Sequence, residues 1–338
     1  MKENVFFFAN GMPRLLMSSV IAETVYEKQK KYLILLDQFG YDYDTLLPSV
    51  APLFDDIFRL KISAKGYSHA DQFFSVYFKR YAGLRNFFKP NSDLVLFGFR
   101  SPPQKFMIRQ NLRLGNSIQV YAEGLAVDRY FTPHDDTNLL RRWGRRIFPG
   151  AFDFQHNYEK FHLFNKEIYK HSPWYPKLET MFNLYGSPAF SKYAALLTDD
   201  LCLDDISGYD TVFFGQPLSN FDDIMSREEE EGMLTRIVGD RKALILPHPN
   251  EILGDSHKYQ CLPKGKLYRS PVPNDLLLWK LRPKVTMTYS STIAVIYAMT
   301  YPDTTNYFYP IRRQQYDMLS KYQETQPNMV VSDEFLDA

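Results

Sequence analysis

Apolar and polar residues follow two alternating patterns in the first half of the chain. Short apolar runs, each typical of a buried strand, occur within residues 4–10, 31–39, 56–62, 93–99 and 117–123. Between these runs, residues 13–29 and 69–88 carry apolar side chains at helical spacing. This alternation predicts βαβ units built on a parallel sheet.

The same rhythm resumes after residue 209 and predicts a second parallel sheet. This part of the chain has apolar runs in 209–218, 242–251 and 274–281 and a charged helix over 227–240. A strand that leads directly into a helix follows over 284–299. Residues 130–195 are rich in aromatic residues, His and Arg, and show no strand period, so we predict a helical or irregular bridge there. The predicted parts are an N-terminal domain, 1–195, a C-terminal domain, 196–315, and a final helix with a polar tail, 316–338.

Composition narrows the class of protein. Of the 338 residues, 45% are apolar and 23% are charged, which is typical of globular domains. Forty basic against 39 acidic residues leave a net charge of +1, so no overall field attracts nucleic acid, and an anionic partner needs a local site. Cys202 and Cys261 are too far apart in sequence for a zinc motif or a disulfide scaffold, which favours a reducing cytosol.

The N-terminal apolar run is short and ends in the turn-forming pair Asn10-Gly11, which favours a buried strand over a signal peptide. No apolar run reaches the 18 or so residues that span a bilayer. We therefore expect a cytoplasmic protein that is soluble or lies on a membrane surface.

Polar residues stand at the ends of the predicted strands, where open α/β sheets bind their ligands. Glu123 follows the strand 117–121 and precedes Gly124. This carboxylate can act as a general base if burial raises its pKa, or it can be a solvated turn residue. Gly215 and Gln216 end another strand, where Gly permits close approach of a ligand and the amide can bind a base or sugar, unless they form a simple turn before Pro217.

Two further strand ends favour an anionic ligand. His248 lies between Pro247 and Pro249, which fix the backbone and direct an imidazole that can bind phosphate, although a lone loop His is often only a surface residue. Ser290, Ser291 and Thr292 stand at the start of the predicted helix. Their hydroxyls, with the free amides and dipole of the helix start, can form an anion site, or they can be simple N-caps.

The order of these motifs resembles that of the bacterial sialyltransferases, whose short motifs are Asp/Glu-Asp/Glu-Gly, His-Pro and Ser-Ser/Thr. The closest resemblance is to the lipooligosaccharide sialyltransferase family, glycosyltransferase family 52. The matching segments are AEG at 122–124, GQPL at 215–218, PHPNE at 247–251, VPNDLLLWKLRPKV at 272–285 and YSST at 289–292. The opening strand and helix also look like those of the family, and residues 130–200 match least well.

This resemblance implies a GT-B fold, with two Rossmann-like domains whose parallel sheets face a central cleft: an acceptor-side N-terminal domain and a nucleotide-sugar-binding C-terminal domain. It also implies transfer of sialic acid from CMP-sialic acid to a glycan hydroxyl, with inversion, no cofactor and no essential metal. Glu123 would be the base, and His248 would bind the CMP phosphate and help it depart. The remaining implied donor-binding residues are Gly215, Gln216, Pro249, Ser290, Ser291 and Thr292.

The chain departs from the family pattern at two places. The first acidic position of the carboxylate motif is Ala122, which leaves Glu123 alone and makes Asp128 a competing base. Asn274 stands where relatives often carry Glu. The first departure bears on the identity of the base and the second on the identity of the donor.

The resemblance points to a bacterial surface glycan, of the lipooligosaccharide or capsule type, as acceptor. Arg141, Arg142, Arg145 and Arg146 surround Trp143. They can grip an anionic acceptor, can rest on phospholipid at the inner face of the bacterial inner membrane, or can be a solvated helix face.

Three alternatives stay open. A same-fold transferase could use a glucosyl or galactosyl donor, which preference for UDP over CMP would reveal. A non-catalytic nucleotide-binding or glycan-binding protein, in which Ala122 marks a decayed site, would bind CMP without turnover. A Ser/His hydrolase fits less well, because Ser290 lacks the Gly-x-Ser-x-Gly elbow.

Overall fold

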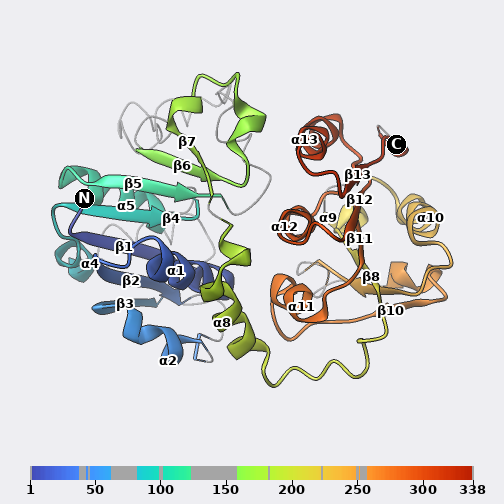
Figure 1. Cartoon of the computed structure of the whole chain (residues 1–338), viewed down its shortest axis with the longest axis horizontal. Helices are drawn as coiled ribbons and strands as arrows, with labels where there is room; N and C mark the ends of the chain where they lie inside the picture. The colour runs from blue at the N-terminus through green and yellow to red at the C-terminus, as the bar shows by residue number, and fades with distance from the viewer. Residues whose placement is uncertain are drawn as a thin grey trace. The chain divides into compact units, whose positions relative to one another are not determined.

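The computed structural model describes residues 2–37, 43–44, 46–61, 82–98, 102–122, 158–181, 183–221, 224–248, 251 and 257–336. The chain divides into two compact units, Met1–Tyr193 (unit 1) and Ala194–Ala338 (unit 2). Each unit is built on one parallel sheet with helices packed against it (Figure 1). This confirms the predicted class of two parallel α/β domains.

The sheet of unit 1 has seven strands in the order β3-β2-β1-β4-β5-β6-β7, and every neighbouring pair is parallel. The strands are β1 Asn4–Ala9, β2 Lys30–Asp37, β3 Asp56–Lys61, β4 Ser92–Leu96, β5 Ser117–Tyr121, β6 Lys160–Leu163 and β7 Leu178–Thr180. The helices are α1 Met12–Thr24, α2 Leu47–Val50, α4 Ala82–Phe87 and α5 Pro102–Arg113, and α8 Pro188–Thr198 crosses the division between the units. Short 3-10 helices are η1 Ala51–Leu53, η3 Lys166–Tyr169, η4 Tyr175–Lys177 and η5 Leu184–Gly186.

The first βα turn shows how the sequence sets the local structure. All six residues of β1 are buried, as expected for a central parallel strand covered on both faces. Gly11 then takes φ 107°, a left-handed value that favours glycine, and α1 begins with Pro in its first turn. Asn10 and Gly11 therefore mark the carboxyl end of β1.

The segment predicted to be helical or irregular contains two strands. β6 pairs with β5, and β7 pairs with β6, so both extend the sheet of unit 1. They contain only four and three residues, which is too short for a strand period to be seen among so many aromatic residues. The prediction of no strand is therefore wrong for residues 160–163 and 178–180.

The sheet of unit 2 has six parallel strands in the order β10-β9-β8-β11-β12-β13. The strands are β8 Thr211–Phe214, β9 Ala243–Leu246, β10 Gly265–Leu267, β11 Val285–Thr288, β12 Thr305–Phe308 and β13 Met329–Val331. The helices are α9 Leu218–Phe221, α10 Arg227–Val238, α11 Asn274–Leu281, α12 Thr292–Thr300 and α13 Arg313–Gln323, with the 3-10 helix η7 His257–Cys261. β13 lies in the segment predicted to be a polar tail, and it forms because Met329 is buried against the edge of the sheet.

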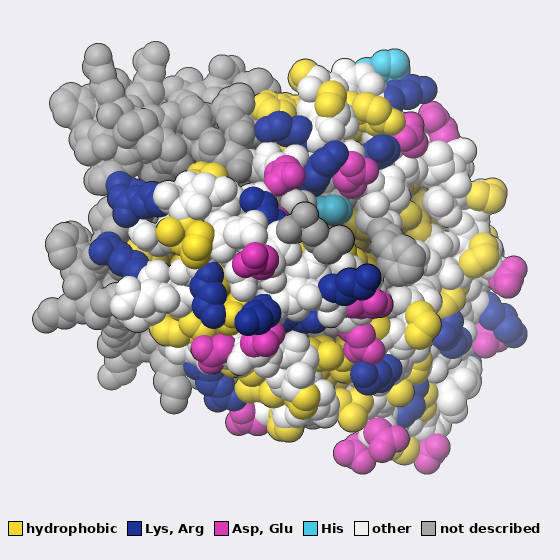
Figure 2. Space-filling view, turned by 60° about the vertical axis from the view of Figure 1, so that its left-hand side comes forward, with side chains coloured by type: hydrophobic (Ala, Val, Ile, Leu, Met, Phe, Trp, Pro, Cys, Tyr) yellow, Lys and Arg dark blue, Asp and Glu magenta, His cyan; other side chains and the backbone are white. Residues whose placement is uncertain are grey.

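The surface is mixed in charge. On the face drawn in Figure 2, Lys and Arg side chains of the described residues are interspersed with Asp and Glu side chains. This agrees with the near balance of 40 basic and 39 acidic residues. Among the described helices, none is both long and apolar enough to cross a membrane.

Candidate nucleotide-binding site

The predicted donor-binding residues of unit 2 follow three adjacent strands. β9, β8 and β11 are neighbours in the sheet, and His248, Gly215-Gln216 and Ser290-Ser291 follow their respective carboxyl ends. Because neighbouring strands are about 4.8 Å apart, the three ends span about 10 Å. The strand order reverses between β8 and β11, and such a switch point is where open α/β sheets form a ligand crevice.

The loop after β8 is fixed by its backbone. The amide of Gly215 donates a hydrogen bond to the carbonyl of Leu246 at the end of β9 (2.9 Å). A Cβ at Gly215 would overlap the hydroxyl of Tyr259 and lie 2.7 Å from Oε2 of Glu251, and both side chains are buried. Glycine is therefore required here because buried side chains, not a ligand alone, approach the backbone closely.

His248 is half-buried and is held by its own turn. Its backbone N–H donates to Oε2 of Glu251 (2.6 Å), and the N–H of Glu251 donates to the carbonyl of His248 (2.8 Å). Burial lowers the pKa of the His248 imidazole; Lys258 lowers it further, and Glu251 opposes both. A neutral ring can still donate one N–H to an anion, and a bound phosphate would favour its protonation.

The helix start after β11 is tied to its neighbours. The N–H of Ser291 donates to Oγ1 of Thr288 (3.1 Å), and that hydroxyl in turn contacts the carbonyl of Phe214 at the end of β8 (3.4 Å). The hydroxyl of Ser290 accepts a hydrogen bond from Nε2 of Gln315 on α13 (3.0 Å). Ser291 occupies the N-cap position of α12 but its side chain makes no capping hydrogen bond, and Thr292 is the first helical residue.

A buried charged cluster lies behind the first two loops, and we call Glu230, Glu251, Lys258 and Tyr259 the charged cluster. The Lys258 ammonium contacts Oε1 of Glu230 (2.5 Å), Oε1 of Glu251 and the carbonyl of Gln216 (2.8 Å). The Tyr259 hydroxyl lies 3.1 and 3.0 Å from the two carboxylate oxygens of Glu251. All four side chains are buried, and burial together with Glu251 raises the pKa of Tyr259.

Sequence patterns do not single out this charged cluster. Glu230 belongs to a run of four glutamates that predicts a solvated helix face, and Glu228 and Glu229 of that run are indeed exposed. Ser226 and Glu229 form a capping box that starts α10, and this start directs Glu230 toward η7. Glu251 belongs to the quoted PHPNE segment, so its place three residues after His248 is the only sequence signal for the cluster.

In unit 1, the carboxyl end of β5 leads toward the predicted base. Tyr121 and Ala122 are buried, and the N–H of Ala122 donates to the carbonyl of His162 on β6 (2.9 Å). The His162 ring stacks on Tyr121 with centroids 4.1 Å apart, and its Nε2 lies 3.1 Å from Oε1 of Gln119. Burial lowers the pKa of His162 to about 4.

The ends of β1 and β2 in unit 1 are joined by one hydroxyl. The Tyr43 hydroxyl accepts a hydrogen bond from the N–H of Gly11 (2.6 Å) and donates one to the carbonyl of Leu36 (2.8 Å). Tyr43 is buried, so both backbone groups are satisfied away from water. This hydroxyl fixes the loop after β1 next to the switch point between β1 and β4.

Several predicted residues lie outside the described part of the chain. They are Glu123, Asp128, Pro249 and the basic residues Arg141, Arg142, Arg145 and Arg146. Their assignments stay predictions. Asn274 is described and begins α11 after the N-cap residue Pro273.

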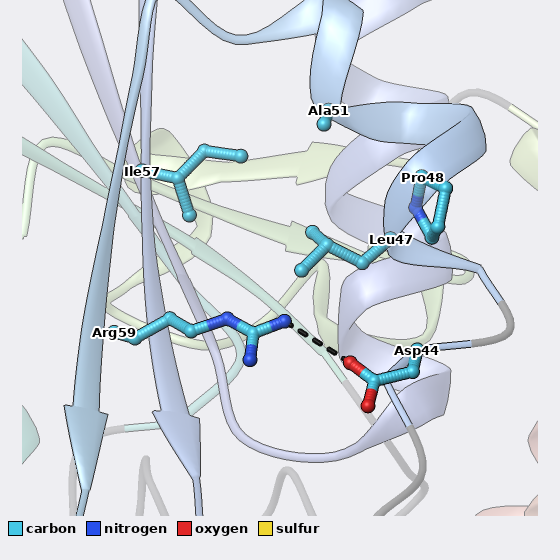
Figure 3. Close-up of a pocket in the computed structure, with 6 residues that line it drawn as sticks. All are labelled: Asp44, Leu47, Pro48, Ala51, Ile57 and Arg59. Carbon is cyan, nitrogen blue, oxygen red and sulfur yellow. Dashed lines mark hydrogen bonds and ion pairs between the residues drawn. The ribbon is translucent and has the colours of Figure 1, made fainter.

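A pocket of about 470 Å³ lies in unit 1 between α2 and the edge strand β3 (Figure 3). Its walls are largely apolar, and its two charged side chains, Arg59 and Asp44, pair across it at 3.2 Å. None of the residues that line it is a predicted site residue. The Asp44 carboxylate already neutralises the Arg59 guanidinium, so this pocket is a poor phosphate site. We therefore place the candidate site at the strand ends of unit 2.

No protein-family model matches the chain, and no curated protein sequence is significantly similar to it. Solved structures with the same fold exist at low sequence identity. An alpha/beta-galactoside alpha-2,3-sialyltransferase from the luminous marine bacterium Photobacterium phosphoreum superimposes with a TM-score of 0.55 at 10% identity, over 98% of each chain.

Two further structures are similar to a comparable degree. The UDP-GlcNAc 2-epimerase from Neisseria meningitidis bound to UDP-GlcNAc gives a TM-score of 0.56 at 11% identity, over 92% of this chain and 83% of that one. Arabidopsis thaliana UGT89C1 complexed with UDP-L-rhamnose gives 0.53 at 10% identity, over 98% and 85%. The protein has the GT-B fold.

Proposed function

We propose that the protein is an inverting, metal-independent sialyltransferase that moves sialic acid from CMP-sialic acid to a hydroxyl of a bacterial surface glycan. One observation carries the proposal. The three motifs implied to bind the donor follow adjacent strand ends around the switch point of unit 2. Further support comes from the sialyltransferase that matches over 98% of both chains.

The proposed phosphate site consists of hydroxyls, amides and an imidazole. Ser291 makes no capping bond to α12, so the first amides of the helix and the Ser290 and Ser291 hydroxyls are suited to an anion. His248 donates its ring N–H from the neighbouring side. Together these groups stabilise the negative charge that develops on the phosphate as CMP leaves.

The proposed reaction is a single displacement. Glu123 takes the proton of the acceptor hydroxyl, the hydroxyl oxygen attacks the anomeric carbon of sialic acid, and the bond from that carbon to the CMP phosphate oxygen breaks with inversion. CMP leaves as the anion held by His248, Ser290 and Ser291. Asp128 takes the role of base if Glu123 does not.

Metal independence is a separate part of the proposal. The chain has an Asp-x-Asp sequence at residues 42–44, a pattern that could hold a metal ion. Asp44, however, pairs with Arg59 at 3.2 Å on the surface of unit 1. We expect CMP release to continue in EDTA, and activity that EDTA abolishes and Mg²⁺ restores would contradict this part alone.

The test of the whole proposal is CMP release from CMP-sialic acid, with and without a lactose-type acceptor. We expect acceptor-dependent release that falls about 100-fold or more in Glu123→Gln and in His248→Ala, because the first removes the group that takes the acceptor proton and the second removes a donor that stabilises the charge developing on the phosphate. Asp128→Asn is the matched control. If Asp128→Asn abolishes release and Glu123→Gln does not, the base assignment is wrong.

Other donors are the second candidate, favoured by the UDP-sugar complexes among the similar folds. Competition between CMP and UDP for the free protein distinguishes the two donor classes. Tighter binding of UDP, with release of UDP from a glucosyl or galactosyl donor, would replace the sialyl assignment. Binding of CMP without turnover by any acceptor would indicate a non-catalytic nucleotide-binding or glycan-binding protein.

A further inference from the structure

Lys258 is the buried cation of the charged cluster, and it lies between two buried carboxylates. Its side chain is 2% exposed, and those of Glu230 and Glu251 are 0% exposed. Taking three ions out of water is costly, and buried ion pairs are often no more stabilising than apolar residues of the same shape. Stability alone therefore does not explain a buried lysine at this position.

The contacts of Lys258 join the two loops that carry the predicted donor-binding residues. Its ammonium accepts no bond and donates to the Gln216 carbonyl after β8 and to Glu251, whose other oxygen binds the His248 N–H after β9. One nitrogen atom thus holds the Gln216 loop directly and the His248 loop through a single intervening carboxylate. Neither contact involves the side chains that would touch a nucleotide.

We propose that Lys258 is a positioning residue that fixes the Gln216 and His248 loops relative to each other and cancels the charge of Glu251 beside the anion site. The inference rests on the proposed nucleotide-binding function for its consequence, but its geometry stands within unit 2 alone. Lys258 acts through Glu251 and the backbone, without contact with the donor.

The electrostatic part follows from the signs of the charges. A carboxylate beside His248 would repel an anionic donor, and it favours the protonated imidazole. Lys258 opposes both effects because its positive charge lies against the same carboxylate. Among the described residues, the charged groups that act on His248 are Glu251 of its own turn and Lys258 of η7, whereas Glu230 of α10 is joined to it only through Lys258.

The test is the His248 pKa in the free protein, measured by NMR on protein with labelled histidines, in wild type and three variants. One of the seven histidine signals is assigned through His248→Gln. We expect the pKa to rise in Lys258→Met and to fall in Glu251→Gln. Glu230→Gln, the matched control with the same chemical change in the same cluster, should leave it within a few tenths of a unit.

The opposite signs of the expected pKa shifts distinguish charge cancellation by Lys258 from a general loosening of the His248 loop. A cluster with only a structural role would expose His248 in every variant and move its pKa toward the ordinary value in all of them. The same shift in Glu251→Gln and Glu230→Gln would therefore overturn the proposal. If Lys258→Met does not fold, the two Glu→Gln variants still decide the question.

CMP binding supplies the functional readout. By calorimetry at neutral pH, we expect Lys258→Met to weaken CMP binding about 10-fold or more, and Glu230→Gln to change it less than about threefold. Thr286→Val removes a buried hydroxyl that is hydrogen-bonded to Asn306 at 2.6 Å in the sheet of unit 2. It is the control for a loss of stability in unit 2 without a change in the charged cluster. Folded Lys258→Met with wild-type affinity would refute the positioning role, whereas wild type that binds no CMP would refute the proposed function and leave the NMR result to decide the inference.

Discussion

The two units use different chemistry for the same structural task. In unit 1 the Tyr43 hydroxyl joins the ends of β1 and β2 by two neutral hydrogen bonds, to Gly11 and to Leu36. In unit 2 the Lys258 ammonium joins the ends of β8 and β9, directly at Gln216 and through Glu251 at His248. A neutral hydroxyl is sufficient to join two strand ends, so the charges of unit 2 need another explanation.

The ligand expected at each place supplies that explanation. A loop that receives a glycan hydroxyl needs fixed geometry but no net charge, which a tyrosine provides. A loop that receives a phosphate beside a histidine needs fixed geometry and a controlled local charge, which a hydroxyl cannot provide. If the proposed function holds, the buried ion pair at these strand ends marks the unit that binds the anionic donor.

Removing the joining side chain in each unit should have its largest effect on stability. Lys258→Met leaves two buried carboxylates uncompensated and should lower the free energy of unfolding of unit 2 by about 3 to 5 kcal/mol. Tyr43→Phe leaves the Gly11 N–H and the Leu36 carbonyl without this partner and should lower that of unit 1 by about 1 to 3 kcal/mol. Denaturant unfolding, followed by a probe in each unit because the units can unfold separately, measures both.

A triple variant sharpens the same comparison. Lys258→Met combined with Glu230→Gln and Glu251→Gln removes every charge of the cluster and should regain most of the lost stability, since no buried charge is left unpaired. It should not regain CMP affinity. Recovery of both would show that the charges have no role in binding, and recovery of neither would show that packing, not charge, is what Lys258 supplies.

The second prediction concerns pH and unit 1. Burial lowers the pKa of His162 to about 4 in the folded protein, against an unfolded value near 6.5. The unfolded chain therefore binds the proton more tightly, and the stability that His162 contributes is present above pH 6.5 and is lost as pH falls toward 4. The difference corresponds to about 3 kcal/mol at most.

His162→Phe and His162→Gln test this linkage. Both remove the titrating ring, so both should flatten the stability of unit 1 between pH 4 and 6.5 relative to wild type. Only the Gln variant also loses the ring stacked on Tyr121 at 4.1 Å, and it should be the less stable at pH 8. An unchanged pH slope in both variants would show that other groups set the acid sensitivity of unit 1.

The sequence is sufficient to predict most of this architecture, because a continuous apolar run is a clear signal of a buried strand. β1, β2 and β9 follow from uninterrupted apolar runs, and the place of His248 and Ser290 at strand ends follows from the βα order. β6 and β12 have polar residues among their apolar ones, and β7 and β13 contain only three residues each, so these strands are defined by their neighbours more than by their own pattern.

The charged cluster is beyond sequence reasoning for a different reason. Glu230 and Lys258 look like any surface charges, and only the packing of α10 on η7 buries them together. Local pattern cannot report a contact between residues 28 positions apart. The strand order was needed as well, because it alone places the β9 loop next to the β8 loop.

The smallest expected effect lies on the opposite side of the switch point, at Gln315 of α13. Its Nε2 donates to the Ser290 hydroxyl at 3.0 Å, and its Oε1 is buried with no hydrogen-bond partner among the described residues. Gln315→Ala should weaken CMP binding about three- to tenfold, the effect of one lost hydrogen bond of about 1 kcal/mol. Gln315→Glu should weaken it more, since it adds a negative charge beside the proposed phosphate site.

Gln314→Ala, on the exposed neighbouring position, is the matched control and should bind CMP as wild type does. Equal affinity of all three variants would restrict the anion site to the α12 start and the His248 loop, and would leave Lys258 as the main residue that positions the site from behind.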